Sequence, residues 1–178
     1  MFKFYDYNPW PTSNQKFNVA ITTKKLTNVT MTTKRLTQDT AFNIIISDLG
    51  ISAPIITGID PADEEKYDIA LRDGVLLLPG KGEVGEPGNV VIYGHSSSDD
   101  ILGRYNTVFS KLNNLKNNDE IKIQKDGKNY IYFVTGKKIV AATDLSVLNQ
   151  TTDETLTLIT CWPIGTDKER LIVTAKQA

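Results

Sequence analysis

Short apolar runs recur along the chain from residue 41 onward, and turn residues separate them. Runs of this length that alternate with polar residues or contain many β-branched side chains are typical of strands. Because numerous short strands favour a sandwich or a closed barrel, and closure hides strand edges, we expect a mainly β, closed barrel. The predicted strands are Asn43–Ser47, Ala53–Thr57, Val75–Leu78, Asn89–His95, Glu120–Lys125, Tyr130–Lys137, Lys138–Ala142, Thr155–Cys161 and Leu171–Ala175.

Two short helices are predicted between the strands. One begins at Pro61, because proline followed by acidic residues is typical of a first helical turn, and the other runs from Tyr105 to Leu112. Asp126-Gly127 separates two alternating runs and predicts a tight hairpin turn, because such a turn needs positive φ angles.

The first forty residues differ in composition from the rest. They are rich in Thr, Lys and Asn, and the segment Thr22–Thr27 recurs in similar form as Thr32–Thr37. Two copies are too few for a solenoid, which needs about three or more repeats. We therefore predict an N-terminal arm or linker over residues 1–40 and one domain over residues 41–178.

Length, charge and cysteine content restrict the class of protein. The chain has 178 residues, a formal net charge of -1 and one cysteine. The balanced charge argues against nucleic-acid binding, and a single cysteine allows no internal disulfide. No apolar run approaches the ~20 residues of a membrane span. We expect a membrane anchor only in a full-length form with an N-terminal span missing from this sequence.

The only cysteine and the only histidine each lie at the end of a predicted strand. Pro163 and Gly165 turn the chain after Cys161, so a hairpin would set Arg170 opposite the thiol. A nearby imidazole or guanidinium favours the thiolate, which is the nucleophilic form. Cys161, His95 and Arg170 are therefore the candidate catalytic residues.

The same residues also have structural interpretations. A lone cysteine in a β-rich chain is more often a buried core residue than a nucleophile, so the joint placement of the three residues carries the prediction. The acidic residues of the loops are scattered and form no twelve-residue calcium loop. We predict no metal and no other cofactor.

Several motifs together resemble the sortases, cysteine transpeptidases that join proteins to Gram-positive cell walls or build pili. Thr157-Leu158-Ile159-Thr160-Cys161 resembles the family's Thr-Leu-x-Thr-Cys signature, and Arg170 follows at the spacing of its essential arginine. Gly88 to His95 resembles the segment that ends on the family's histidine. Ile51–Ile55 and Leu71–Val75 are similar to core segments, so the resemblance extends from about Ile44 to Ala175.

The resemblance implies an eight-stranded barrel in which Cys161, His95 and Arg170 surround one groove, bordered by Thr160 and Trp162 as substrate-binding residues. It implies that a Leu-Pro-x-Thr-Gly-like sorting signal is cleaved between Thr and Gly through a thioester. An amine acceptor, from a cell-wall precursor or a pilin lysine, then takes the acyl group at the cell surface. Asn8-Pro9-Trp10 is similar to the Asp-Pro-aromatic lid of pilin-type members, with Asn in place of Asp. The subclass stays open.

Two other functions are consistent with these motifs. A cysteine peptidase would hydrolyse similar peptides, and an assay with and without an amine acceptor separates it from a transpeptidase. A non-catalytic β-barrel peptide-binding module would bind the peptide reversibly, without dependence on Cys161, His95 or Arg170.

Overall fold

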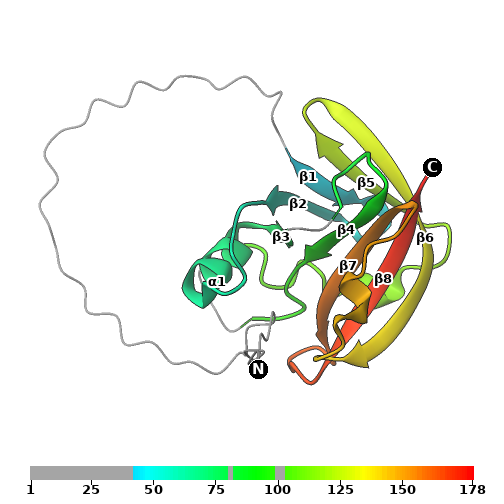
Figure 1. The fold of residues 1–178 in the computed structure, drawn as a ribbon. Helices are drawn as coiled ribbons and strands as arrows, with labels where there is room; N and C mark the ends of the chain where they lie inside the picture. The colour runs from blue at the N-terminus through cyan, green and yellow to red at the C-terminus, as the bar shows by residue number, and fades with distance from the viewer. Residues whose placement is uncertain (1–41, 80–81, 99–102) are drawn as a thin grey trace, which may run out of the picture.

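The computed structural model describes residues 42–79, 82–98 and 103–178. Eight strands close into a barrel in the order β1-β2-β3-β4-β7-β8-β6-β5 (Figure 1). The strands are β1 Asn43–Ile46, β2 Ile51–Ile56, β3 Val75–Leu77, β4 Gly88–Tyr93, β5 Glu120–Lys125, β6 Lys128–Ala141, β7 Glu154–Trp162 and β8 Glu169–Gln177. The predicted closed barrel is confirmed, whereas the predicted arm, residues 1–40, lies outside the described residues.

The prediction of two strands between Tyr130 and Ala142 is wrong. One 14-residue strand, β6, covers this stretch and pairs with β5 in its first half and with β8 along most of its length. The register shifts between Val134 and Gly136, so an irregularity interrupts the alternation of side chains without ending the strand. The alternation of inward and outward side chains therefore shifts by one residue within a single continuous strand.

The two predicted helices also differ from the observed ones. Helix α1, Glu64–Asp73, begins after Pro61, because the Asp63 side chain accepts a hydrogen bond from the backbone N–H of Lys66 and caps the first turn. Residues 104–111 form turns rather than a helix, followed by the short 3-10 helix η2, Leu112–Asn114. The backbone N–H of Phe109 bonds the carbonyl of His95 and so is not available for a helix.

The tight turn at Asp126-Gly127 is confirmed. Asp126 has φ 51° and Gly127 has φ 75°, and the pair joins β5 to β6 where Lys125 faces Lys128. Both central residues have the positive φ that the shortest hairpins need.

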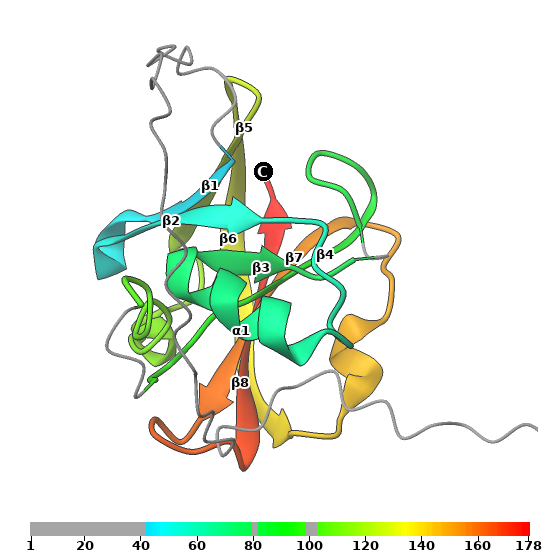
Figure 2. The ribbon, with the colours of Figure 1, turned by 90° about the vertical axis from the view of Figure 1, so that its left-hand side faces the viewer.

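Apolar side chains form two clusters on opposite faces of the sheet. The inner cluster fills the barrel and includes Val90, Ile92 and Leu158. The outer cluster lies between the outer face of the sheet and α1, and it includes Tyr93 and Ile159. Figure 2 shows α1 across strands β3 and β4. Strand β4 is buried along its whole length, because both of its faces are covered.

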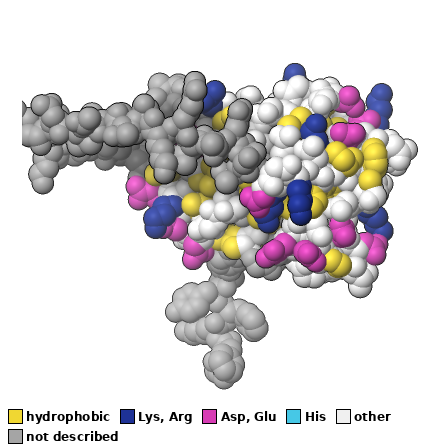
Figure 3. All heavy atoms as spheres, turned by 90° about the horizontal axis from the view of Figure 1, so that it is seen from above, with side chains coloured by type: hydrophobic (Ala, Val, Ile, Leu, Met, Phe, Trp, Pro, Cys, Tyr) yellow, Lys and Arg dark blue, Asp and Glu magenta, His cyan; other side chains and the backbone are white. Residues whose placement is uncertain are grey.

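The remaining elements are short. The 3-10 helices η1, Ser47–Leu49, and η3, Leu145–Leu148, lie in the connections before β2 and before β7. On the face in Figure 3, acidic and basic side chains are interspersed with apolar and uncharged ones. No helix within the described ranges has the length and apolar character that crossing a membrane requires.

Candidate active site

Strands β4 and β7 run parallel and bring two chemically important strand ends together. Tyr93, the last residue of β4, faces Ile159 of β7. Beyond this pair, the Gly94 N–H donates to the Ile159 carbonyl at 3.1 Å, and Thr160 Oγ1 donates to the Gly94 carbonyl at 2.7 Å. These bonds hold Gly94, the residue before His95, beside Thr160, the residue before Cys161.

The hairpin of β7 and β8 brings the guanidinium to the same place. The antiparallel register sets Cys161 directly opposite Arg170, which confirms the predicted hairpin. Arg170 is only 2% exposed, and its Nη1 donates to the carbonyls of Asp167 at 2.7 Å and Glu169 at 2.9 Å. A buried guanidinium needs such acceptors, so these carbonyls fix the positive charge beside the end of β7.

The segment that carries His95 is tied to its neighbours by backbone contacts. The His95 carbonyl accepts the Phe109 N–H at 2.9 Å. Two residues further, Ser97 Oγ accepts the N–H of Gly165, in the turn between β7 and β8, at 2.9 Å. His95 itself is partly exposed. The histidine segment and the hairpin that holds Cys161 and Arg170 are therefore joined directly.

The Cys161 thiol is free and partly exposed. Its Sγ lies 3.0 Å from the hydroxyl of Tyr93, and the cysteine packs against the outer cluster. Burial raises the pKa of Tyr93 well above its usual value, and a negative charge on Cys161 raises it further. The Tyr93 hydroxyl thus keeps its proton next to the sulfur.

Thr160 and Trp162, the two predicted substrate-binding residues, flank the cysteine. Thr160 is 1% exposed and its hydroxyl is engaged with the Gly94 carbonyl. Trp162 is partly exposed and packs against the inner cluster. The structure gives Thr160 a role in joining β4 to β7, and contact of either residue with substrate stays a prediction.

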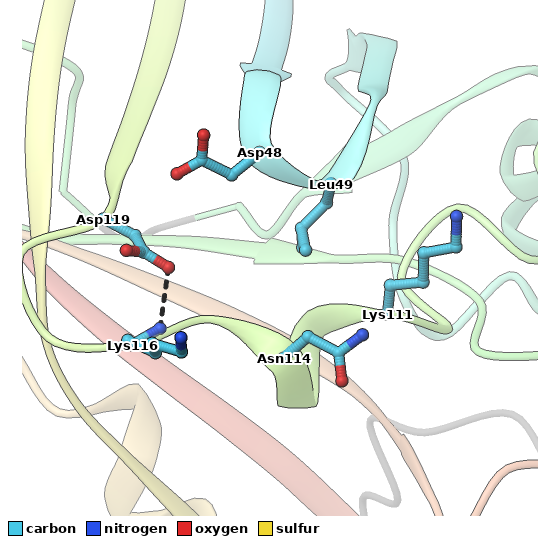
Figure 4. Close-up of a pocket in the computed structure, with 6 residues that line it drawn as sticks. All are labelled: Asp48, Leu49, Lys111, Asn114, Lys116 and Asp119. Atoms are coloured by element: carbon cyan, nitrogen blue, oxygen red, sulfur yellow. Dashed lines mark hydrogen bonds between the residues drawn. The ribbon is translucent and has the colours of Figure 1, made fainter.

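A separate hollow lies away from these residues, between η1 and the chain around η2 (Figure 4). It has a volume of about 480 Å³ and is lined by Asp48, Leu49, Lys111, Asn114, Lys116 and Asp119. None of the predicted site residues lines it. Over the described residues, His, Cys, Asp and Glu side chains form no group of three or more that could hold a metal ion.

Sequence patterns alone missed two residues of this site, Tyr93 and Ser97. The sequence pattern indicates that Tyr93 is one more apolar residue of a buried strand and that Ser97 belongs to a polar loop. Pairing β4 with β7 in parallel would have found Tyr93, because Cys161 lies two residues beyond its partner Ile159, on the same face of the strand. Local periodicity carries no information about that pairing.

Comparison with known proteins gives a consistent result. The family model described as "Sortase domain" matches residues 44–178. A curated protein of Bacillus subtilis, named "Putative sortase YwpE", is 36% identical over 86 residues, which cover 48% of this chain and 79% of that protein.

Solved structures show the same likeness. A lid mutant of sortase A from Corynebacterium diphtheriae is 28% identical, with a TM-score of 0.65 over 82% of this chain and 74% of that chain. Sortase C from Clostridium perfringens is 26% identical, with a TM-score of 0.63 over 79% of this chain and 71% of that chain. A sortase D5 transpeptidase from Clostridium perfringens is 29% identical, with a TM-score of 0.63 over 79% of each chain. These three differ in subclass and are about equally similar, so the comparison assigns no subclass.

Proposed function

Because the chain belongs to the sortase family of cysteine transpeptidases, we propose that it cleaves a Leu-Pro-x-Thr-Gly-like sorting signal between Thr and Gly. The acyl group passes through a thioester on Cys161 to an amine. The observation that supports this proposal is the strand register, which sets Cys161 opposite Arg170 and pairs β7 in parallel with β4, the strand that His95 follows. A nucleophile, an acid–base group and a fixed positive charge are what acyl transfer needs.

Cys161 acts as the nucleophile. Its thiolate attacks the carbonyl carbon of the Thr-Gly bond, and the carbonyl electrons move to the oxygen to give a tetrahedral oxyanion. When this intermediate collapses, the C–N bond breaks and the His95 imidazolium donates a proton to the departing glycine amine. The product is a thioester, and His95 is left neutral.

In the second half of the reaction, an acceptor amine attacks the thioester carbonyl and neutral His95 takes up its proton. The C–S bond breaks, the thiolate leaves, and an amide forms. The imidazolium and the thiolate are thereby restored together. The same two groups serve both halves of the reaction because each half undoes the proton transfer of the other.

Arg170 stabilises the developing oxyanion. A guanidinium stays charged at every relevant pH, so it serves as a donor of charge-assisted hydrogen bonds and not as a base. Its bonds to the Asp167 and Glu169 carbonyls preorganise the charge, so little reorganisation is needed when the oxyanion forms. The backbone N–H of Trp162 is the proposed second oxyanion donor.

Binding of the peptide involves the apolar surroundings of the cysteine. We assign Trp162 to the wall of the groove and Thr160 to its border, as the family resemblance implies. Apolar side chains near the thioester would exclude water and favour transfer to an amine over hydrolysis. The acceptor is a cell-wall amine or a pilin lysine, and the site of action is the cell surface, outside the cytoplasm.

Product analysis tests this function. A Leu-Pro-x-Thr-Gly peptide labelled at its N-terminus is incubated with the protein, with and without glycine peptides or lysine derivatives in parallel. We expect a ligated product that depends on the amine and is absent with Cys161→Ala. Hydrolysis at the same rate with and without amine would support a peptidase instead, and reversible binding indifferent to Cys161→Ala would support a binding module.

A further inference from the structure

The Tyr93 hydroxyl contacts the Cys161 sulfur because of the way the strands pair. Tyr93 faces Ile159 across the β4–β7 ladder, and Cys161 is two residues further along β7 on the same face. The tyrosine side chain is 1% exposed, and its hydroxyl lies 3.0 Å from Sγ. The contact is thus built into two buried strands and not into a loop.

Helix α1 supports the tyrosine ring from the other side. The rings of Tyr67 and Tyr93 have centroids 6.0 Å apart and planes tilted by 41°, a common arrangement for packed aromatic pairs. Both tyrosines belong to the outer cluster. A ring enclosed in this way has little rotational freedom, so its hydroxyl stays at one place beside the sulfur.

The direction of the hydrogen bond depends on the charge of the sulfur. While Cys161 is a neutral thiol, either group can donate. Burial raises the pKa of Tyr93 well above its usual value, so the phenol keeps its proton under conditions in which a thiol loses one. Once the thiolate has formed, the tyrosine O–H donates and the sulfur accepts.

Other titratable or charged groups also face this pair. Arg170 on β8 lies opposite Cys161 in the ladder, and its positive charge acts on Tyr93 as well. His95 follows β4, and Tyr67 approaches from α1. The Tyr93 hydroxyl makes a hydrogen bond to the sulfur itself, at a distance that allows direct stabilisation of the anion.

We propose that Tyr93 is a positioning residue for the nucleophile, whose hydroxyl holds the Cys161 sulfur in place and stabilises its thiolate. The inference rests on the proposed function of Cys161. A thioester sulfur carries no negative charge, so the hydrogen bond weakens when the acyl-enzyme forms. The bond strengthens again when the C–S bond breaks and the thiolate leaves, so Tyr93 affects how much thiolate is present, how reactive it is and how readily it leaves the acyl group.

Alkylation of Cys161 by iodoacetamide, followed by intact mass over a range of pH, measures thiolate formation without any peptide substrate. In Tyr93→Phe, we expect the midpoint of the alkylation rate to move to higher pH by about one unit, because a charge-assisted hydrogen bond to the anion is lost. At high pH, where both proteins are fully ionised, the variant should react at least as fast as the wild type. A thiolate that has lost a donor is the stronger nucleophile.

Tyr132→Phe is the matched control. Tyr132 is also 1% exposed, but it belongs to the inner cluster and its hydroxyl bonds the backbone of Gly85. Tyr132→Phe removes a buried phenol hydroxyl from the same barrel and should leave the pH midpoint of the alkylation rate unchanged. Near-UV circular dichroism of both variants reports whether the barrel is folded.

A second substitution, Tyr93→3-fluorotyrosine, keeps the hydroxyl and the packing but makes the phenol a stronger donor. It should move the midpoint to lower pH, the opposite of Tyr93→Phe, and it keeps the test valid if the phenylalanine variant does not fold. An unchanged midpoint in these variants, or an equal shift in Tyr132→Phe, would overturn the inference. Failure of wild-type protein to ligate peptide would overturn the proposed function alone, because alkylation needs no catalysis.

Discussion

Arg170 has a structural role in the hairpin and, in the proposed function, a chemical role as well. It is 2% exposed, it pairs with Cys161 across the hairpin, and it donates to two carbonyls of the preceding turn. The carbonyls compensate for the loss of water around the guanidinium and also fix its position. On the proposed function, the stability of the hairpin and the stabilisation of the oxyanion therefore depend on the same group.

Replacing Arg170 separates these tasks. Arg170→Ala should lower the rate of acyl transfer by about 10²–10³-fold, as loss of an oxyanion donor does, and lower the free energy of unfolding by about 1–3 kcal/mol. Arg170→Lys should recover part of the stability but little of the rate, because an ammonium lacks the planar set of donors. Chemical denaturation and initial ligation rates measure both quantities. Full activity in the alanine variant would exclude the assigned role.

The roles proposed for Cys161 and His95 predict that activity depends on pH in two directions. The thiolate is lost as the pH falls and the imidazolium is lost as the pH rises, so kcat/KM should be bell-shaped. His95→Ala should lower the rate by about 10²–10⁴-fold and remove one of the two limbs. The profile is obtained from ligation rates in buffers of constant ionic strength. A wild-type profile with a single limb would argue against His95 as the proton donor.

At the scale of elements, hydrogen bonds from polar side chains stabilise both ends of the parallel pair of β4 and β7. At the start of β4, Asn89 Nδ2 donates to the Val147 and Asn149 carbonyls, and its Oδ1 accepts from Thr157 Oγ1 at 2.7 Å. At the other end, Thr160 donates to the Gly94 carbonyl. These bonds hold the register of β4 against β7, on which the proposed alignment of His95 with Cys161 depends.

Thr160→Val keeps the size of the side chain and removes its donor. The Gly94 carbonyl then loses a buried partner, so we expect the free energy of unfolding to fall by about 1–2 kcal/mol and the ligation rate to fall as His95 becomes less well aligned. Thr160→Ser keeps the hydroxyl and serves as the control for both measurements. Equal behaviour of the valine and serine variants would indicate that this bond does not align the site.

An element could be predicted from the sequence where its conformation depends on residues close together in the chain. Strands with clear alternation and the turn at Asp126-Gly127 were predicted from nearby residues, because their conformations depend on those residues. The start of α1 was missed because the Asp63 side chain caps the helix after Pro61. The boundary predicted between Lys137 and Lys138 is wrong, because both residues pair with β8 and the register shift lies between Val134 and Gly136.

At the scale of the whole molecule, the site depends on contacts between distant parts of the chain. The sequence predicted the barrel, the hairpin of Cys161 and Arg170, and the three catalytic candidates with the help of motif resemblance. The contact between Tyr93 and Cys161 joins residues 68 positions apart. It arises only from the pairing of β4 with β7, which hydrophobic periodicity does not encode.

The division into an arm and one domain gives a prediction at this scale. The family model begins at residue 44, and strands β1 to β8 already close the barrel. A chain that starts at residue 41 should therefore fold with an unfolding temperature close to that of the whole sequence. Differential scanning calorimetry of the two chains compares them directly. A strongly lowered temperature, or loss of the cooperative transition, would show that residues 1–40 belong to the domain.

The most direct test of the central claim is the mass of the intact protein after brief exposure to a Leu-Pro-x-Thr-Gly peptide without acceptor amine. We expect an adduct with the mass of the peptide's acyl portion, located on Cys161 by peptide mapping and released by hydroxylamine as a thioester would be. The adduct should be absent in Cys161→Ala. Turnover of the peptide in Cys161→Ala, or an adduct on any other residue, would contradict the account.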